Sequence, residues 1–196
     1  MKTVAEAITG SRLKAKILNW LYVESTASAR LTERQLAKQV GIPAGSIHKV
    51  LLALVADQLV VREETARGPE YRAPFDDPRF KSLIMFFRQE SEVVTALKRA
   101  LKPFKSIEYA CTFGSFASGT THKDSDVDVL VLEASENDRF QIMSALSRVS
   151  DKIGREANPQ FYPVEEFRSN ASKGEAIALS ILGNPRITLK GTFTWP

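Results

Sequence analysis

Hydrophobic positions in the first 75 residues recur mainly at helical spacing. Residues 11–23 (SRLKAKILNWLYV) and 46–59 (SIHKVLLALVADQL) place apolar side chains three or four positions apart, which predicts two amphipathic helices. Between them, Thr32 followed by Gln35 forms a capping-box pattern and predicts the start of a short helix. Residues 60–74 (VVREETARGPEYRAP) surround a Gly-Pro turn and predict two short strands.

An apolar stripe then runs through residues 77–104, from an Asp-Pro pair to Pro103. Its members fall at helical spacing, and further apolar residues lie off the stripe, so we expect this helix to be covered on two sides. The pattern predicts one linking helix, at residues 76–103, that packs between two domains or against a second copy of the chain. The latter arrangement predicts a homodimer.

The second half of the chain mixes strand patterns with helix patterns. Residues 106–113 (SIEYACTF) and 126–133 (DVDVLVLE) predict strands, and REANPQFYP at 155–163 predicts a weaker strand interrupted by prolines. Helices are expected at 137–154 and 175–182, with a short strand near the end of the chain. The fold class is therefore α+β, with one domain at 1–75, the linking helix at 76–103 and a small mixed-sheet domain at 104–196.

Composition narrows the class of protein. The chain is 43% hydrophobic and 26% charged, as soluble globular proteins are. No apolar run reaches the roughly 18–20 residues that cross a bilayer, so we expect a cytoplasmic protein with no membrane partner. The single cysteine, Cys111, excludes an internal disulfide.

Charge is distributed unevenly. Residues 1–75 hold eleven Lys and Arg against seven Asp and Glu, whereas the remaining residues hold sixteen of each. The net charge of +4 therefore belongs to the first domain, which suggests a polyanionic partner for that domain.

Candidate chemistry is concentrated in residues 113–132 (FGSFASGTTHKDSDVDVLVL). Asp126 and Asp128 are two apart on a predicted strand, so their carboxylates leave the same face. Two carboxylates so close raise each other's pKa unless a cation lies between them, and Mg²⁺ suits such a pair. Gly114 and Ser115 follow the preceding strand, where a glycine backbone and a hydroxyl can approach a phosphate. Together they predict a site for a nucleoside triphosphate and its metal.

The combination is more specific than its parts. A strand, Gly-Ser, nine further residues and then Ser-Asp-Val-Asp opening a hydrophobic strand resembles the minimal members of the polymerase-β-like nucleotidyltransferase superfamily. The resemblance covers roughly residues 104–192 and implies that Gly114 and Ser115 bind nucleotide phosphates while Asp126 and Asp128 bind Mg²⁺. It also implies a third, catalytic carboxylate on a neighbouring strand. Glu156 and Asn158 are the two candidates for that position, and an asparagine there would be a poor base.

The first domain has a resemblance of its own. Helix, short helix, turn, helix and hairpin at residues 8–74 resemble the winged helix-turn-helix domain of transcription regulators. This implies that Ser46, His48 and Lys49 face a DNA major groove and that Arg67 on the hairpin meets phosphates. The alternative is that the domain docks a protein instead.

Two functions follow from these resemblances. One is a DNA-binding nucleotidyltransferase that moves a nucleoside monophosphate from a triphosphate to a protein or tRNA hydroxyl with Mg²⁺, in a toxin–antitoxin setting and regulating its own operon. The other is a transcription regulator whose nucleotidyltransferase-like domain senses a nucleotide with little or no turnover. Whether Glu156 or Asn158 occupies the position of the third carboxylate distinguishes the two functions.

Overall fold

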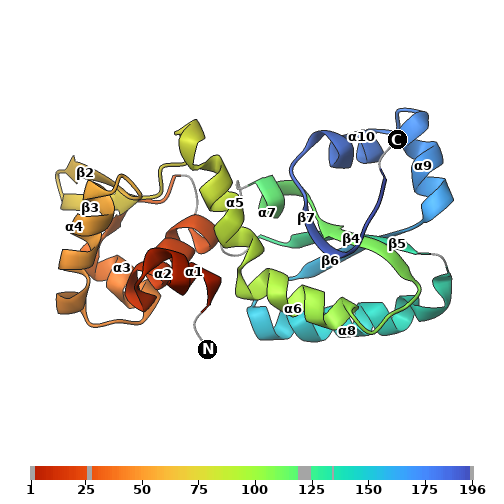
Figure 1. The fold of residues 1–196 in the computed structure, drawn as a ribbon, viewed down its shortest axis with the longest axis horizontal. Helices are drawn as coiled ribbons and strands as arrows, with labels where there is room; N and C mark the ends of the chain where they lie inside the picture. Colours follow the sequence, from red (N-terminus) through yellow and green to blue (C-terminus); the bar gives the residue numbers. More distant parts are fainter. Residues whose placement is uncertain (1–2, 26–27, 119–124, 134, 195–196) are drawn as a thin grey trace. The chain divides into compact units, whose positions relative to one another are not determined.

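The chain divides into two compact units, Met1–Ser91 and Glu92–Pro196 (Figure 1). A computed structural model describes residues 3–25, 28–118, 125–133 and 135–194. Each unit has a buried hydrophobic core of its own.

The first unit combines short helices with a three-stranded antiparallel sheet of strand order β1-β3-β2. Its elements are α1 (Val4–Thr9), α2 (Arg12–Asn19), a π-helical turn (Trp20–Glu24), β1 (Leu31–Thr32), α3 (Glu33–Val40), a 3-10 turn (Ala44–Ser46), α4 (His48–Ala56), β2 (Val61–Thr65), β3 (Gly68–Arg72), a 3-10 turn (Pro78–Phe80) and α5 (Lys81–Gln89).

Local sequence explains most of these elements. Thr32 and Gln35 form the expected capping box at the start of α3, and Ser11 caps α2. Two elements were not predicted: α1, which has no buried residue, and β1, which has two residues and so no readable pattern.

The axes of α3 and of the segment Ala44–Ala56 differ by 106°. As a bent pair, these helices have a length and composition that would suit a membrane. No single helix in the described part of the chain is long and apolar enough to cross one.

The expected linking helix at 76–103 is wrong as a single element. The structure has two helices there, α5 and α6 (Glu92–Leu101). The helical conformation is interrupted between them at Glu90 and Ser91. The apolar stripe is shared accordingly: Ile84 and Phe87 of α5 belong to the first core, and Leu97 of α6 is fully buried in the second unit. The stripe therefore needs no second copy of the chain to cover it, and the homodimer stays a prediction.

The second unit is built on a four-stranded mixed sheet of order β6-β5-β4-β7. After α6 its elements are β4 (Ile107–Thr112), α7 (Gly114–Ser118), β5 (Val127–Glu133), a 3-10 turn (Glu136–Asp138), α8 (Arg139–Ile153), β6 (Ala157–Pro163), α9 (Val164–Ser172), α10 (Ala176–Gly183) and β7 (Ile187–Gly191). Strand β5 runs antiparallel to β4 and parallel to β6.

Helices cover both faces of this sheet. In Figure 1, α6 and α8 lie along one face, and α9 and α10 lie along the other. Both faces of β5 are consequently buried beyond Asp128, because Leu130 and Leu132 pack in the core with α9 and α10. The edge position of β6 explains how a strand accepts Pro159 and Pro163, since a proline has no N–H to donate to a second neighbour.

Candidate functional site

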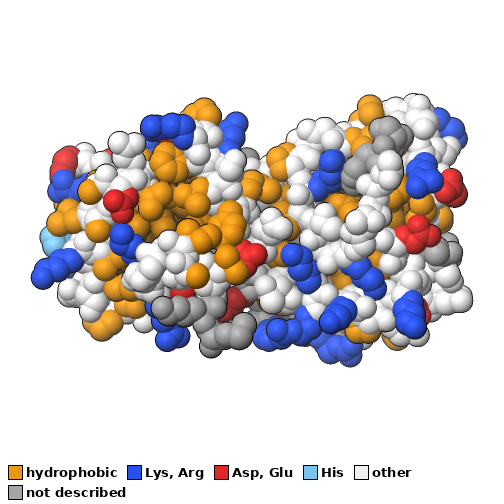
Figure 2. All heavy atoms as spheres, viewed as in Figure 1, with side chains coloured by type: hydrophobic (Ala, Val, Ile, Leu, Met, Phe, Trp, Pro, Cys, Tyr) orange, Lys and Arg blue, Asp and Glu red, His pale blue; other side chains and the backbone are white. Residues whose placement is uncertain are grey.

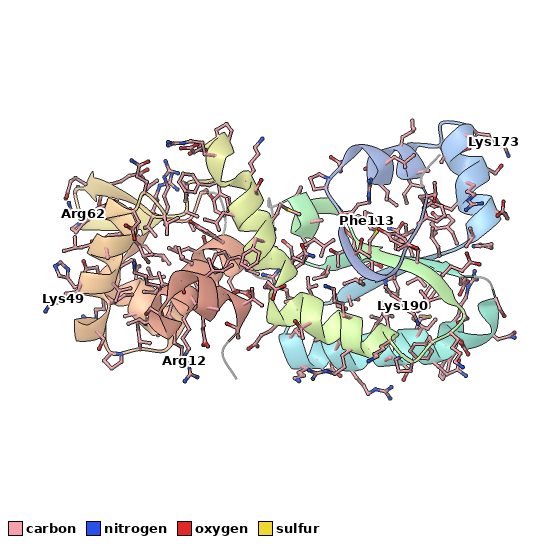
Figure 3. All side chains as sticks on the ribbon, in the orientation of Figure 1. Arg12, Lys49, Arg62, Phe113, Lys173 and Lys190 are labelled. Atoms are coloured by element: carbon pink, nitrogen blue, oxygen red, sulfur yellow. The ribbon has the colours of Figure 1, made fainter. Side chains whose placement is uncertain are left out.

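The end of β4 and the start of β5 bring the predicted site residues together. The two strands are antiparallel neighbours, and the backbone N–H of Phe113 donates to the carbonyl of Asp128 at 3.1 Å. Phe113 is buried at this point and is labelled in Figure 3. The chain then turns at Gly114 into α7, so the Gly-Ser pair begins beside Asp128.

Gly114 lies directly against the Asp128 side chain. Its φ is +68°, and a Cβ placed on it would come within 2.7 Å of Asp128 Oδ2. Any other residue would therefore meet both a strained backbone and a clash with the carboxylate. This explains in physical terms why a glycine begins α7. Ser115 follows it, half-buried, as the second residue of α7.

Asp126 and Asp128 differ in their surroundings. Asp126 is exposed and lies just before β5, whereas Asp128 is half-buried within that strand. Burial raises the pKa of the Asp128 carboxyl, a hydrogen bond from Asn158 opposes this, and the negative charge of Asp126 raises it further. The carboxylate pair thus has the mutual repulsion that a bound cation would relieve.

Strand register identifies the residue opposite Asp128. In the parallel pair β5–β6, Asp128 is aligned with Asn158, and the Asn158 Nδ2 donates to Asp128 Oδ1 at 3.4 Å. Glu156 lies one step before β6, and its carbonyl accepts from the Val127 N–H at 2.7 Å. Alternation along β6 therefore places Glu156 beside Asp126 and Asn158 beside Asp128. The amide, and not the carboxylate, touches Asp128.

A groove leads to these two residues from helix α8. It has a volume of about 730 Å³ and runs between the outer side of α8 and the edge strand β6. Glu156 and Asn158 lie at its β6 end, and Met143, Ser147 and Asp151 line it from α8. The sequence pattern did not indicate this groove, because it forms only when α8 packs beside β6.

The residues present suit Mg²⁺ with a nucleotide better than they suit a metal alone. Within residues 3–25, 28–118, 125–133 and 135–194, no three Asp, Glu, His or Cys side chains gather as a metal cage. Mg²⁺ commonly takes only one or two protein carboxylates and completes its octahedron with phosphate and water. Asp126 and Asp128 fit that requirement. His122 and Lys123, in the loop between the motifs, lie outside the described residues.

The residues predicted to meet DNA are in the first unit and are all exposed. Ser46 ends the 3-10 turn before α4, His48 and Lys49 form the first turn of α4, and Arg67 lies in the turn between β2 and β3. Figure 3 shows Lys49 at the outer side of α4. All four side chains are therefore open to solvent, as residues of a binding surface must be.

One contact near these residues was not predicted. Glu33, at the start of α3, accepts hydrogen bonds of 2.8 Å from His48 on α4 and from the Tyr71 hydroxyl on β3. Burial alone would raise the pKa of Glu33, but these hydrogen bonds outweigh it and lower the pKa below its usual value. His48 is therefore already engaged by a carboxylate, which no local pattern could reveal because the three residues are far apart in sequence.

Comparisons with known proteins address the second unit. Residues 95–162 match the family described as "Polymerase beta, Nucleotidyltransferase". No curated protein matches the chain by sequence. A solved structure described as "Crystal structure of the toxin-antitoxin with AMP-PNP" is 16% identical, with a TM-score of 0.36, and the likeness covers 50% of this chain and 73% of that one. So distant a likeness adds nothing to the sequence match.

The matched segment runs from within α6 to the end of β6 and so includes Gly114, Asp126, Asp128 and Asn158. It covers every described residue that the structure gathers around the Asp128 carboxylate. The second unit therefore carries, at residues 95–162, a region of the polymerase β nucleotidyltransferase type.

Proposed function

We propose that the second unit transfers a nucleoside monophosphate from a nucleoside triphosphate to a hydroxyl of a macromolecule, protein or tRNA, with Mg²⁺. The observation that carries this is the contact between the Gly114 backbone and the Asp128 carboxylate, with Asp126 two residues away. It supports a role in which a phosphate approaches this backbone beside carboxylates of the kind that bind Mg²⁺. The match over residues 95–162 supports the same chemistry.

Each residue has a role in this proposal. Gly114 and Ser115 hold phosphate oxygens through the open backbone and the hydroxyl, and Asp126 and Asp128 hold Mg²⁺, which neutralises phosphate charge when bound. The acceptor oxygen bonds to the α-phosphorus, the bond from that phosphorus to its bridging oxygen breaks, and pyrophosphate leaves with the electron pair. Glu156, exposed just before β6, accepts the hydroxyl proton.

A labelling experiment tests the transfer. With labelled triphosphates, Mg²⁺ and cell lysate, the wild-type protein should label an acceptor, and the double variant Asp126→Ala, Asp128→Ala should not. A test with each of the four triphosphates separately would identify the preferred base. Equal labelling by wild type and variant would show that these carboxylates do no chemistry.

A second function is favoured by one observation, the alignment of Asn158 with Asp128. An amide cannot take a proton from an acceptor, so a site that depends on that position would bind Mg²⁺ and nucleotide with little turnover. The protein would then be a regulator that senses a nucleotide. Calorimetry showing Mg²⁺-dependent nucleotide binding, without labelling of any acceptor, would favour this function over transfer.

For the first unit we propose a winged helix-turn-helix that binds DNA. The order of its elements, the sheet order β1-β3-β2 and the 106° between α3 and the segment Ala44–Ala56 all support it, since helix-turn-helix pairs cross at about 90–120°. In this arrangement α4 enters the major groove and the β2–β3 hairpin lies beside it. Such a unit would let the protein regulate its own operon.

Salt dependence tests the DNA proposal. Affinity for promoter DNA should fall steeply with salt, and Lys49→Ala with Arg67→Ala should weaken binding and flatten the salt slope by about two. Lys38→Ala, which removes an exposed cation of α3, provides a control. Binding that ignores salt and these two residues would indicate a protein-docking unit instead.

A further inference from the structure

The outer side of the α6–α8 layer carries cations that no carboxylate neutralises. Six cations belong to it: Lys98 and Arg99 on α6, Lys102 and Lys105 just after α6, and Arg148 and Lys152 on α8. All but the half-buried Lys98 are exposed, and none of the six forms an ion pair within the described part of the chain. Figure 2 shows Lys and Arg side chains along the part of the second unit that α6 and α8 form. The excess positive charge of the layer suits a polyanion.

An exposed aromatic side chain lies on the same layer. Phe140, in the first turn of α8, is 80% exposed, and Met143 one turn later is 54% exposed. Phe140 is the most exposed of the large hydrophobic side chains in the described part of the chain, so its ring is available to a ligand. Aromatic rings beside cations are what unpaired bases of RNA stack on.

The helical period arranges these side chains in order around α8. At about 100° per residue, Phe140, Ser147 and Asp151 share the outer side, with Met143 on the flank toward β6. Arg148 and Lys152 fall on the opposite flank, toward α6, whose own cations include Lys98. Arg148 and Lys152 therefore lie on one flank of α8, about two and three turns beyond Phe140, and the groove lies on the other flank.

The groove connects this surface to the nucleotide site. It starts at Met143 on α8 and reaches Glu156 and Asn158, the latter bonded to Asp128. The carboxylates of Asp151 and Glu156 line it, so phosphates belong on the α6 side and the groove suits the less charged bases and sugars. A strand that lies along α8 would have its end beside Asp128.

We propose that the α6–α8 surface binds a folded RNA with an unpaired end, and that this RNA is the acceptor. The cations contact its phosphates, and Phe140 stacks on one unpaired base. A protein occupant fits less well, because Phe140 and Met143 alone offer far less than the roughly 800 Å² per partner that stable protein interfaces bury. The acceptor role rests on the transfer proposed above, whereas the binding does not.

Fluorescence anisotropy with bulk tRNA and the full chain, without nucleotide or Mg²⁺, tests the surface. Arg148→Ala with Lys152→Ala should weaken binding and reduce the salt slope by about two. Phe140→Ala should weaken binding about tenfold and leave the salt slope unchanged, because stacking is not electrostatic. These two distinct responses are what the proposal requires.

Controls separate this surface from others. Lys173, at the end of α9 on the opposite face of the sheet, is labelled in Figure 3, and Lys173→Ala should leave tRNA affinity unchanged. Leu179 on α10 is 50% exposed, so Leu179→Ala matches Phe140→Ala as the loss of an exposed apolar side chain. The variant Lys49→Ala with Arg67→Ala tests whether RNA uses the first unit instead. Circular dichroism checks that each variant is folded.

Several outcomes would overturn the proposal. Equal competition by duplex DNA would show a general polyanion surface, and a tRNA affinity unaffected by the α8 variants would place RNA elsewhere. If Phe140→Ala instead abolished self-association in gel filtration, the face would be a protein interface.

The experiments distinguish a wrong RNA-binding proposal from a wrong transfer proposal. The double variant Asp126→Ala, Asp128→Ala should still bind tRNA, because binding does not use the metal site. If a protein acceptor were labelled and the chain did not bind tRNA, the RNA surface would be refuted and the transfer would stand. Binding of tRNA without labelling of any acceptor would refute the transfer and the acceptor role, and would keep the RNA surface.

Discussion

The Gly114 backbone and the Asp128 carboxylate occupy adjoining space, which makes Gly114 a sensitive probe of the site. Gly114→Ala should abolish Mg²⁺-dependent nucleotide binding, because the new Cβ would meet Asp128 Oδ2 at 2.7 Å and push the carboxylate aside. Isothermal titration calorimetry with Mg²⁺ and a triphosphate measures the effect.

Gly154 offers a closely matched control for that substitution. Its φ is +67° against +68° for Gly114, but nothing lies within 4 Å of an added Cβ. Gly154→Ala should therefore cost about 1 kcal/mol of stability from the backbone alone and leave nucleotide binding unchanged. Equal binding losses in both variants would mean that backbone strain, and not the contact with Asp128, explains the result.

Asn158 places a neutral amide, and not a third carboxylate, opposite Asp128. Asn158→Asp places a carboxylate opposite Asp128. If this position, and not Glu156, is the one that takes the acceptor proton, metal-dependent labelling should rise by about 10²-fold, the range for a general base. Without metal the same variant should be less stable, because three carboxylates would repel one another.

Glu156→Gln is the matching test of the other candidate. A loss of labelling in this variant, with no gain from Asn158→Asp, would identify Glu156 as the group that takes the proton. Unchanged labelling in Glu156→Gln would remove it from the mechanism.

Three elements of the first unit meet at Glu33, which joins the start of α3 to α4 and β3. The folded state lowers the pKa of Glu33, so its stabilising effect is present above the unfolded pKa and is lost as pH falls through the folded value. Glu33→Gln should lower the free energy of unfolding at pH 7 by on the order of 1 kcal/mol at most, because the group is partly exposed and solvent screens it. The gap between wild type and variant should close below about pH 4.

Urea unfolding at several pH values measures this difference. Glu64, paired with Arg62 at 2.6 Å on the exposed side of β2, is the control, and Glu64→Gln should change stability little. A Glu33→Gln effect that persisted unchanged at low pH would show that the carboxylate charge is not its source. The same variant should also weaken DNA binding if the Glu33 contact positions His48.

At the scale of the whole molecule, the boundary between units is at Ser91, within the segment expected to be one helix. A fragment of residues 92–196 should fold and unfold cooperatively, whereas a fragment of 104–196 should not. The shorter fragment lacks α6, whose four buried side chains contribute about 2 kcal/mol each, which together approach a typical stability of about 5–15 kcal/mol. Circular dichroism during thermal unfolding distinguishes the two fragments, and cooperative unfolding of both would show that α6 is dispensable.

The elements and the site were predictable to different extents. Helix spacing, the capping box at Thr32 and the strand that carries Asp128 are local properties, because they depend on residues within a few positions of each other. The break at Ser91 was not readable, because α5 and α6 have similar apolar patterns and only their separate cores divide them.

Local sequence by itself determined that a strand carrying Asp128 follows the Gly-Ser turn, with Asp126 two residues earlier in the chain. Only the tertiary structure decided what stands opposite them. The alignment of Asn158 with Asp128 depends on the register of β5 with β6, two strands joined by the whole of α8. A shift of one residue would turn every side chain of β6 to the other face, and no local pattern sets that register where the strand holds two prolines.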